Sequence, residues 1–355
     1  MKKNIFNDDF LLLSGNEIMA ETAIRAGCRY YFGYPITPQN EIPAYMSRRM
    51  PQVDGVFIQA ESELAAISMV MGAAITGKRA LTSSSSPGIS LKQEGISYLA
   101  GCELPAVIIN VMRGGPGLGN IGPSQSDYFQ ATKGGGHGDY HTLVYGPTTL
   151  EETVSVIYSA FEKAEKYRLP VMILVDGIMG QIMEHIKLPR MKKNNKKNFS
   201  WALDGCSKRA PRKIRSLYLK KDELFLHNKK LQKKYAKIEQ QETLWHEWGT
   251  KDADKVVIAY GSPGRLVEDV VKKKRSNKCK IGYLRPITLW PFPGKRICEL
   301  SKRVKKFLVV EMNEGQMVED IIRYTGKNST VEFCGKSGGT ILYAEDIEKA
   351  IDKMF

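Results

Sequence analysis

The chain has 355 residues, enough for two α/β domains with separate cores, and its 42% hydrophobic content is ordinary for a folded protein. No apolar run approaches the roughly 18 residues of a membrane span. The short apolar run near the N-terminus is broken by Asp8 and Asp9, so no signal peptide is expected. The six cysteines are scattered without a CxxC pair, which indicates a reducing cytoplasm and argues against a zinc site or iron–sulfur cluster on this chain.

The formal net charge of +15 is concentrated in one segment. Residues 190–250 carry 17 Lys and Arg against six Asp and Glu, so the rest of the chain is only weakly basic. No nucleic-acid-binding motif accompanies this charge and aromatic residues are sparse there, so nucleic acid is not an expected partner. We interpret the segment as a solvated connection. An attraction for an acidic protein partner is the alternative hypothesis.

The first 189 residues alternate between apolar runs and helical patterns. The expected strands are 55–59, 79–85, 106–112, 141–146 and 170–176, and the expected helices are 61–77 and 149–167. The second helix carries one apolar stripe, formed by Val154, Ile157, Tyr158, Phe161 and Ala164. This alternation predicts an α/β fold with a mostly parallel sheet and helices on both faces.

After Pro189 the composition changes. Residues 190–250 are lysine-rich and are predicted to form a connecting segment with one exposed helix. A second, smaller α/β unit follows, with expected strands at 255–261, 279–293 (including a loop), 305–313 and 330–335, and expected helices at 262–275, 315–325 and 344–355. We therefore predict a first domain over 1–189, a connection over 190–250 and a second domain over 251–355.

The glycine-rich stretch 114–138 follows an expected strand and contains GLGNIG at 117–122, a formal match to the GxGxxG pattern of dinucleotide sites. Prolines bracket this motif and no small-residue helix follows it, so we favour a long loop at the carboxyl ends of the strands, where parallel sheets bind ligands. An NAD-linked dehydrogenase is the alternative, and it predicts NAD binding by the isolated chain. His137 and His141 are surrounded by glycines, and no spacing of Asp, Glu or Cys residues completes a metal site with them.

Two positions suit substrate binding. In GYPITPQNE, residues 33–41, two prolines hold Thr37 in place, although a plain rigid connection is equally compatible with this motif. Arg113 ends the strand 106–112 and can present its planar guanidinium to a substrate carboxylate. The ordinary alternative is a surface arginine at a strand end.

Two carboxylates, Glu61 and Glu63, precede a run of small and apolar residues that continues to Lys78. An acid in a first helical turn complements the helix dipole, which accounts for one acid without any chemistry. The small residues that follow let a ligand or another surface approach the helix closely. A carboxylate at such a contact would lose part of its solvent and is placed to hold or share a proton.

Several stretches resemble the alpha-type subunit of 2-oxoacid:ferredoxin oxidoreductases. ESELAAISMVMGAAITGK is similar to the pyrimidine-binding helix of thiamine diphosphate enzymes, in which a glutamate stands nine residues before a glycine; Glu63 and Gly72 fit this spacing and Glu61 does not. The other stretches are GYPITP, SSPGISLKQEGISYLAGCELP, NVMRGGPG, PSQSDYFQATKGGGHGDY, LRPITLWPFP and VVEMNEGQMVEDI. The last two resemble the transketolase C-terminal-like domain of that subunit. Residues 114–140 and 311–320 are most similar to the 2-oxoisovalerate subgroup, followed by the 2-oxoglutarate subgroup.

The resemblance implies roles for five residues. Glu63 would hydrogen-bond N1′ of the aminopyrimidine and favour the imino tautomer that removes the thiazolium C2 proton. Thr37 would contact the substrate near its reacting carbon, and Arg113 would pair with its carboxylate. Pro35 and Ile36 would contact the cofactor. The reaction implied is oxidative decarboxylation of a 2-oxoacid to acyl-coenzyme A, with electrons passing to ferredoxin.

The resemblance also implies partners. The diphosphate end of the cofactor is held in this family by a GDG motif and a magnesium ion, and this chain has no GDG. A beta-type subunit is therefore expected to supply the diphosphate site, Mg²⁺ and a cluster, with small gamma and ferredoxin-like delta subunits beside it. We expect a dimer of such hetero-oligomers, with the exposed edge of the first domain as an interface. A non-catalytic scaffold is the alternative from another class.

Overall fold

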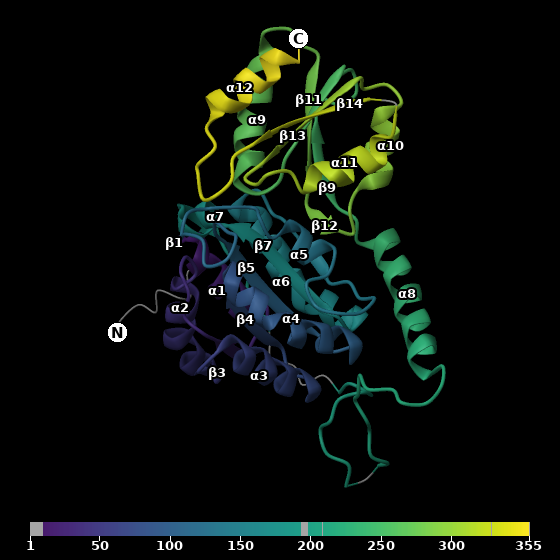
Figure 1. Cartoon of the computed structure of the whole chain (residues 1–355). Coiled ribbons are helices and arrows are strands. Elements are labelled where there is room, and N and C mark those ends of the chain that lie inside the picture. Colours follow the sequence, from purple (N-terminus) through teal and green to yellow (C-terminus); the bar gives the residue numbers. More distant parts are fainter. Residues whose placement is uncertain (1–9, 193–197, 208, 328, 355) are drawn as a thin grey trace.

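The computed structural model describes residues 10–192, 198–207, 209–327 and 329–354. Its larger sheet has seven strands in the order β12-β6-β7-β5-β4-β2-β3 (Figure 1). These strands are β2 (Tyr30–Gly33), β3 (Val56–Gln59), β4 (Ala80–Ser84), β5 (Ala106–Met112), β6 (Leu143–Tyr145), β7 (Pro170–Asp176) and β12 (Thr288–Trp290). Strands β2 to β7 are all parallel, whereas β12 pairs antiparallel with β6.

Helices cover this sheet in two groups, one on each face. The first group is α1 (Gly15–Arg25), α2 (Glu41–Arg49) and α6 (Leu150–Tyr167), and the second is α3 (Glu63–Ile75) with α4 (Ser86–Gly101). Short helices lie at Met50–Val53 (η2), Tyr128–Thr132 (α5) and Gly177–Gln181 (α7). The apolar stripe of α6 is buried, and Thr149 caps its first turn by accepting a hydrogen bond from the Glu152 amide.

A separate pair of strands closes the first part of the chain. Strand β1 (Phe10–Ser14) pairs antiparallel with β8 (Met183–Lys187), which ties the start of the described chain to its own later strand. The connecting segment then extends away from the sheet and returns through α8 (Glu223–Gln241), which runs up the side of the molecule in Figure 1.

The smaller sheet has five strands in the order β14-β13-β10-β11-β9. They are β9 (Trp245–Trp248), β10 (Lys255–Ile258), β11 (Ile281–Pro286), β13 (Lys306–Glu311) and β14 (Thr330–Gly335), and all are parallel except β9. Its helices are α9 (Gly261–Ser276), α10 (Gly294–Ser301), α11 (Met317–Thr325) and α12 (Ala344–Lys353). No helix in the described part of the chain is long and apolar enough to span a bilayer.

The predicted fold class, an α/β protein with mostly parallel sheets, is confirmed. The expected strands and helices recur with small shifts at their ends, and 106–112, 170–176 and 330–335 match without any shift. The range 279–293 was expected to hold one strand followed by a loop. It instead holds two strands, because β11 belongs to the smaller sheet and β12 joins the edge of the larger one. The proposed domain boundaries near residues 190 and 250 stay a prediction.

Candidate active site

Glu63 is the first residue of α3, at the carboxyl-end edge of the larger sheet. Ser62 caps the helix by accepting a hydrogen bond from the Ala65 amide at 3.2 Å. The Glu63 residue is only 6% exposed, yet no other described residue donates a hydrogen bond to its carboxylate. A buried carboxylate without a donor is costly, so this group is suited to a ligand that brings a donor of its own.

Gly88 keeps this carboxylate accessible. It lies in the first turn of α4, and a Cβ atom there would come within 2.5 Å of Glu63 Oε1 and 2.1 Å of Ser84 Oγ. Any larger residue would therefore displace the acid or the end of β4. The close approach of α3 and α4 at Glu63 depends on the missing side chain.

Thr37 and Arg113 are brought together by the loops that follow β2 and β5. The Arg113 guanidinium donates from Nη1 to the Thr37 carbonyl and from Nη2 to the Leu118 carbonyl, both at 3.0 Å. Its Nε is buried without a hydrogen-bond partner. Two carbonyls therefore hold the guanidinium in place, while its Nε donor stays unpaired.

A buried polar network supports Arg113 from behind. Ser86 Oγ accepts a hydrogen bond from the Arg113 backbone N–H at 3.1 Å and donates one to Asp127 Oδ2 at 2.6 Å. The side-chain Nδ2 of Asn110 donates to the same Asp127 oxygen at 2.8 Å. Burial raises the pKa of the Asp127 carboxyl, and the hydrogen bonds from Ser86 and Asn110 oppose this shift. Ser86 thus joins the first turn of α4, which touches Glu63, to the strand end that carries Arg113.

The remaining predicted residues lie in the same loop as Thr37. Pro35 is exposed and Ile36 is half-buried, and the Ile36 carbonyl accepts a hydrogen bond from the Gln39 amide at 3.1 Å. Glu61 is exposed, in contrast to Glu63. The structure thus places Thr37 against Arg113 directly, and the first turn of α4 connects Arg113 to Glu63. The sequence reasoning did not identify Ser86, Gly88 and Asp127; the SSPG motif after an expected strand was the available signal for the first two.

The glycine loop 117–122 closes on itself. The backbone N–H of Asn120 donates to the Gly114 carbonyl at 3.0 Å, and the side-chain Nδ2 of Asn120 donates to the Gly338 carbonyl at 2.6 Å. No helix begins directly after the loop, since α5 starts at Tyr128. This geometry lacks the helix N-terminus that a dinucleotide loop presents to a pyrophosphate.

His141 is packed between aromatic rings. It stacks on Trp290 with ring centroids 4.4 Å apart and meets Tyr235 edge-on at 5.3 Å. Burial lowers the pKa of this imidazole, and the Lys133 charge lowers it further. Within the described ranges, no cluster of three or more His, Cys, Asp or Glu residues is arranged to hold a metal ion.

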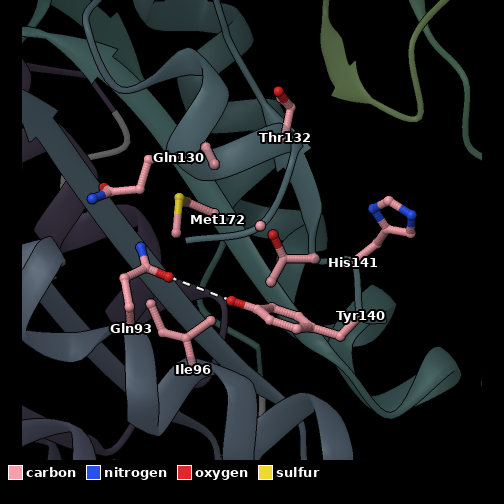
Figure 2. Close-up of a pocket in the computed structure, with 10 residues that line it drawn as sticks. Gln93, Ile96, Gln130, Thr132, Tyr140, His141 and Met172 are labelled. Carbon is pink, nitrogen blue, oxygen red and sulfur yellow. Dashed lines mark hydrogen bonds between the residues drawn. The ribbon is translucent and has the colours of Figure 1, made fainter. Parts of the chain in front are cut away.

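Three cavities in the described part of the chain are lined by other residues. Figure 2 shows a small enclosed cavity beside α4, about 10 Å³ in volume, in which Tyr140 Oη donates to Gln93 Oε1 at 3.4 Å. That volume suits a single water molecule. Two open cavities of about 460 and 430 Å³ are lined mainly by α8 with the loop 133–141 and by the connecting segment. None of these three cavities is lined by Glu63, Thr37 or Arg113.

The site fits one end of an aminopyrimidine cofactor. An unbonded buried carboxylate suits a ring nitrogen that shares a proton with it, and Gly88 leaves the space for close contact. The described residues offer no equivalent group of acids for a metal–diphosphate end. The fold and the site are compatible with the class of α/β domains that bind thiamine diphosphate.

Family comparisons agree with this class. Residues 21–246 match the family described as pyruvate flavodoxin/ferredoxin oxidoreductase, thiamine diP-bdg, and residues 253–347 match pyruvate:ferredoxin oxidoreductase core domain II. The chain belongs to the 2-oxoacid:ferredoxin oxidoreductase subunit family. The resemblance predicted from the sequence motifs is thereby confirmed.

Individual relatives and structures are also similar. The chain is 47% identical to ketoisovalerate oxidoreductase subunit VorB of Methanothermobacter marburgensis, over 96% of each chain. It is 37% identical to 2-oxoglutarate synthase subunit KorA of Methanothermobacter thermautotrophicus, over 96% of this chain and 98% of the relative. It superimposes on 2-oxoglutarate:ferredoxin oxidoreductase from Magnetococcus marinus with a TM-score of 0.89 and 25% identity, covering 98% of this chain and 65% of the other. A split-gene transketolase, at 12% identity and a TM-score of 0.59, shares the fold.

Proposed function

We propose that this chain supplies the pyrimidine end of a thiamine diphosphate site that is completed by a partner subunit. The family decarboxylates 2-oxoacids oxidatively with ferredoxin as electron acceptor. The observation that carries the proposal is the Glu63 carboxylate, which is buried and has no donor among the described residues. When bound, the cofactor supplies the electron sink for decarboxylation. Glu63 holds and moves a proton at N1′ of the pyrimidine.

The other residues of the edge position cofactor and substrate. Arg113 pairs with the carboxylate of the 2-oxoacid, using the buried Nε and the fork that now contacts two carbonyls. Thr37 contacts the substrate near its reacting carbon. Pro35 and Ile36 contact the cofactor from the loop after β2, which keeps these groups on a rigid turn.

The proposed substrates are 2-oxoisovalerate and related branched-chain 2-oxoacids. The similarity to the ketoisovalerate subunit VorB, at 47% identity, supports this choice. The alternative substrate is 2-oxoglutarate, which is supported by 37% identity to KorA and by the likeness to the Magnetococcus marinus enzyme, solved with 2-oxoglutarate, coenzyme A and succinyl-CoA bound. In either case the proposed product is the acyl-coenzyme A.

Partner subunits complete the proposed enzyme. Several relatives are named as subunits, so this chain works with others. We propose a beta-type subunit that holds the diphosphate, Mg²⁺ and an iron–sulfur cluster, together with gamma and delta subunits, in a dimer of hetero-oligomers. Ferredoxin accepts the electrons. We place this assembly in the cytoplasm, where free cysteines like those of this chain stay reduced.

The test of this function is Glu63→Gln in the reconstituted complex. Glutamine keeps the size of the side chain but cannot exchange the proton, so decarboxylation should fall at least ~100-fold while assembly is retained. Glu61→Gln is the matched control, because Glu61 is exposed two residues away and should leave the rate within about twofold. Equal rates for wild type and Glu63→Gln would overturn the assignment.

The substrate is tested separately. Specificity constants for 2-oxoisovalerate and 2-oxoglutarate, measured on the wild-type complex with ferredoxin and coenzyme A, should favour 2-oxoisovalerate at least ~10-fold. The reverse preference would select the 2-oxoglutarate alternative without affecting the role of Glu63.

A further inference from the structure

Lys92 is a buried lysine without a partner. It lies on α4, it is 0% exposed, and its Nζ makes no hydrogen bond to any described residue. Burying an ammonium group is costly unless another charge compensates for it, and a methionine would fill the same space without that cost. A cation in this position therefore calls for a nearby negative group.

The packing of α3 on α4 identifies that group as Glu63. Residues four or three apart on a helix share a face, so Lys92 lies between Gly88 and Gly95 on the face of α4 that meets α3. A Cβ atom at Gly88 would lie 2.5 Å from Glu63 Oε1, and one at Gly95 would lie 2.5 Å from Ile67 Cγ2. Lys92 thus faces the turn of α3 that begins with Glu63.

The charges around Lys92 leave Glu63 as its counter-charge. Burial lowers the pKa of the Lys92 ammonium to about 8, and the Glu63 charge is the group that opposes this shift. The strands β5 and β7 also pack against α4. β5 carries no charged residue, and Asp176 at the end of β7 accepts hydrogen bonds from the Met179 and Ser262 amides. Asp127, near the first turn of α4, is bonded to Ser86 and Asn110.

We propose that Lys92 is a positioning residue that stabilises the carboxylate form of Glu63, so that the shared proton resides on N1′ of the cofactor pyrimidine. The proton moves between one Glu63 oxygen and N1′, and nothing is oxidised or reduced. The ammonium is fully buried whereas Glu63 keeps a small exposed area, so the cation sits behind the acid and the cofactor approaches from the open side. This inference rests on the proposed role of Glu63.

The proposal gives a pH dependence with a defined sign. Lys92 is charged below its pKa and neutral above it, so its support for the Glu63 carboxylate is present at pH 7 and is lost as the pH rises through about 8. In the wild-type complex N1′ should be protonated at neutral pH and should lose its proton with an alkaline midpoint. An arginine at position 92 stays charged and should move that midpoint upward.

The experiment uses thiamine diphosphate labelled with ¹⁵N at N1′, bound to the reconstituted complex. The ¹⁵N chemical shift reports the protonation of N1′ directly, independently of turnover. Lys92→Met should leave N1′ unprotonated at pH 7 and lower decarboxylation about tenfold, the effect of one nearby charge in a protein interior. Lys92→Arg should keep N1′ protonated beyond the wild-type midpoint.

The matched control is Lys234→Met. Lys234 is also mostly buried, but it lies on α8 and pairs with Glu103 at 3.2 Å, away from Glu63. Its replacement should leave the N1′ titration as in the wild type. Wild-type N1′ protonation in Lys92→Met would overturn the proposal. If that variant fails to assemble, an unchanged midpoint in Lys92→Arg would overturn it equally.

Failure of this inference is distinguishable from failure of the proposed function. If Glu63→Gln abolishes decarboxylation while Lys92→Met titrates like the wild type, only the role of Lys92 is lost. If Glu63→Gln is fully active, the proposed function itself is wrong.

Discussion

Two polar regions of this chain differ in how completely their hydrogen bonds are satisfied. Gln125, fully buried where the two sheets meet, uses its backbone and side-chain groups in four hydrogen bonds, to Met312, Asn313 and Tyr260. Glu63, buried at the start of α3, accepts none from the described residues. The first region is complete in the single chain, whereas the second leaves a buried acceptor that the proposed cofactor would satisfy.

The largest expected effect on stability belongs to the completed region. Glu311 is fully buried beside Gln125, and its carboxylate accepts hydrogen bonds from Asn313 and from three backbone amides at the start of α11. Glu311→Ala leaves these donors unpaired, so the free energy of unfolding should fall by about 3 kcal/mol or more. Urea denaturation of the isolated chain measures this.

The control for that experiment is Glu314→Ala, three residues further on and exposed. Its unfolding free energy should stay within about 0.5 kcal/mol of the wild type. A loss below about 1 kcal/mol in Glu311→Ala would contradict the view that this region is held by its satisfied polar groups.

A smaller effect, on catalysis and not on stability, is expected at Arg113. Arg113→Lys keeps the charge but loses the planar fork that contacts the Thr37 and Leu118 carbonyls. The specificity constant for the 2-oxoacid should fall about 10- to 100-fold, mainly through KM, because one charged hydrogen bond to the substrate is lost. Steady-state kinetics of the complex measures this.

Arg168→Lys serves as its control. Arg168 also donates to a backbone carbonyl, that of Glu103 at 3.0 Å, but it lies at the other end of the sheet, beside Trp201. Its specificity constant should match that of the wild type. Equal kinetics for both lysine variants would remove Arg113 from the substrate site.

The smallest expected effect is on association with the proposed partner subunit, at the surface formed by α3 and α4. Leu91 on α4 is 51% exposed, and Leu64 on α3, the helix that packs against α4, is 47% exposed. Leu91→Gln should leave the unfolding free energy of the isolated chain within about 0.5 kcal/mol but weaken subunit association about tenfold. Leu226→Gln, at a 64% exposed position on α8, should weaken it less. The opposite order would place the interface on α8.

The sequence predicted the sheet strands better than the polar interior. The ranges 106–112 and 170–176 were predicted with their exact ends. Both faces of a parallel sheet are covered by helices, so these strands are almost continuously apolar and stand out in the sequence. The pairing of β1 with β8 and of β12 with β6 joins segments far apart in the chain, and short strands carry little periodicity of their own. These contacts follow from tertiary packing and were not predicted.

The candidate site also contains residues that the sequence predicted and one that it did not. Glu63, Thr37 and Arg113 were predicted from the sequence and the family resemblance, and their roles stay a prediction. The structure places Thr37 and Arg113 in contact. Lys92 was not singled out, because a lysine followed by Gln93 and Glu94 is typical of a solvated helix face. Only the packing of α4 on α3 shows that its side chain is buried, on the helix face that meets the turn beginning with Glu63.

The most direct measurement of the central claim is a structure of the assembled complex with thiamine diphosphate bound. The account predicts a Glu63 carboxylate oxygen within hydrogen-bond reach of N1′, about 2.6–3.2 Å, with the diphosphate held by the partner subunit. A cofactor whose pyrimidine ring lies away from Glu63, or whose two ends are both held by this chain, would contradict it.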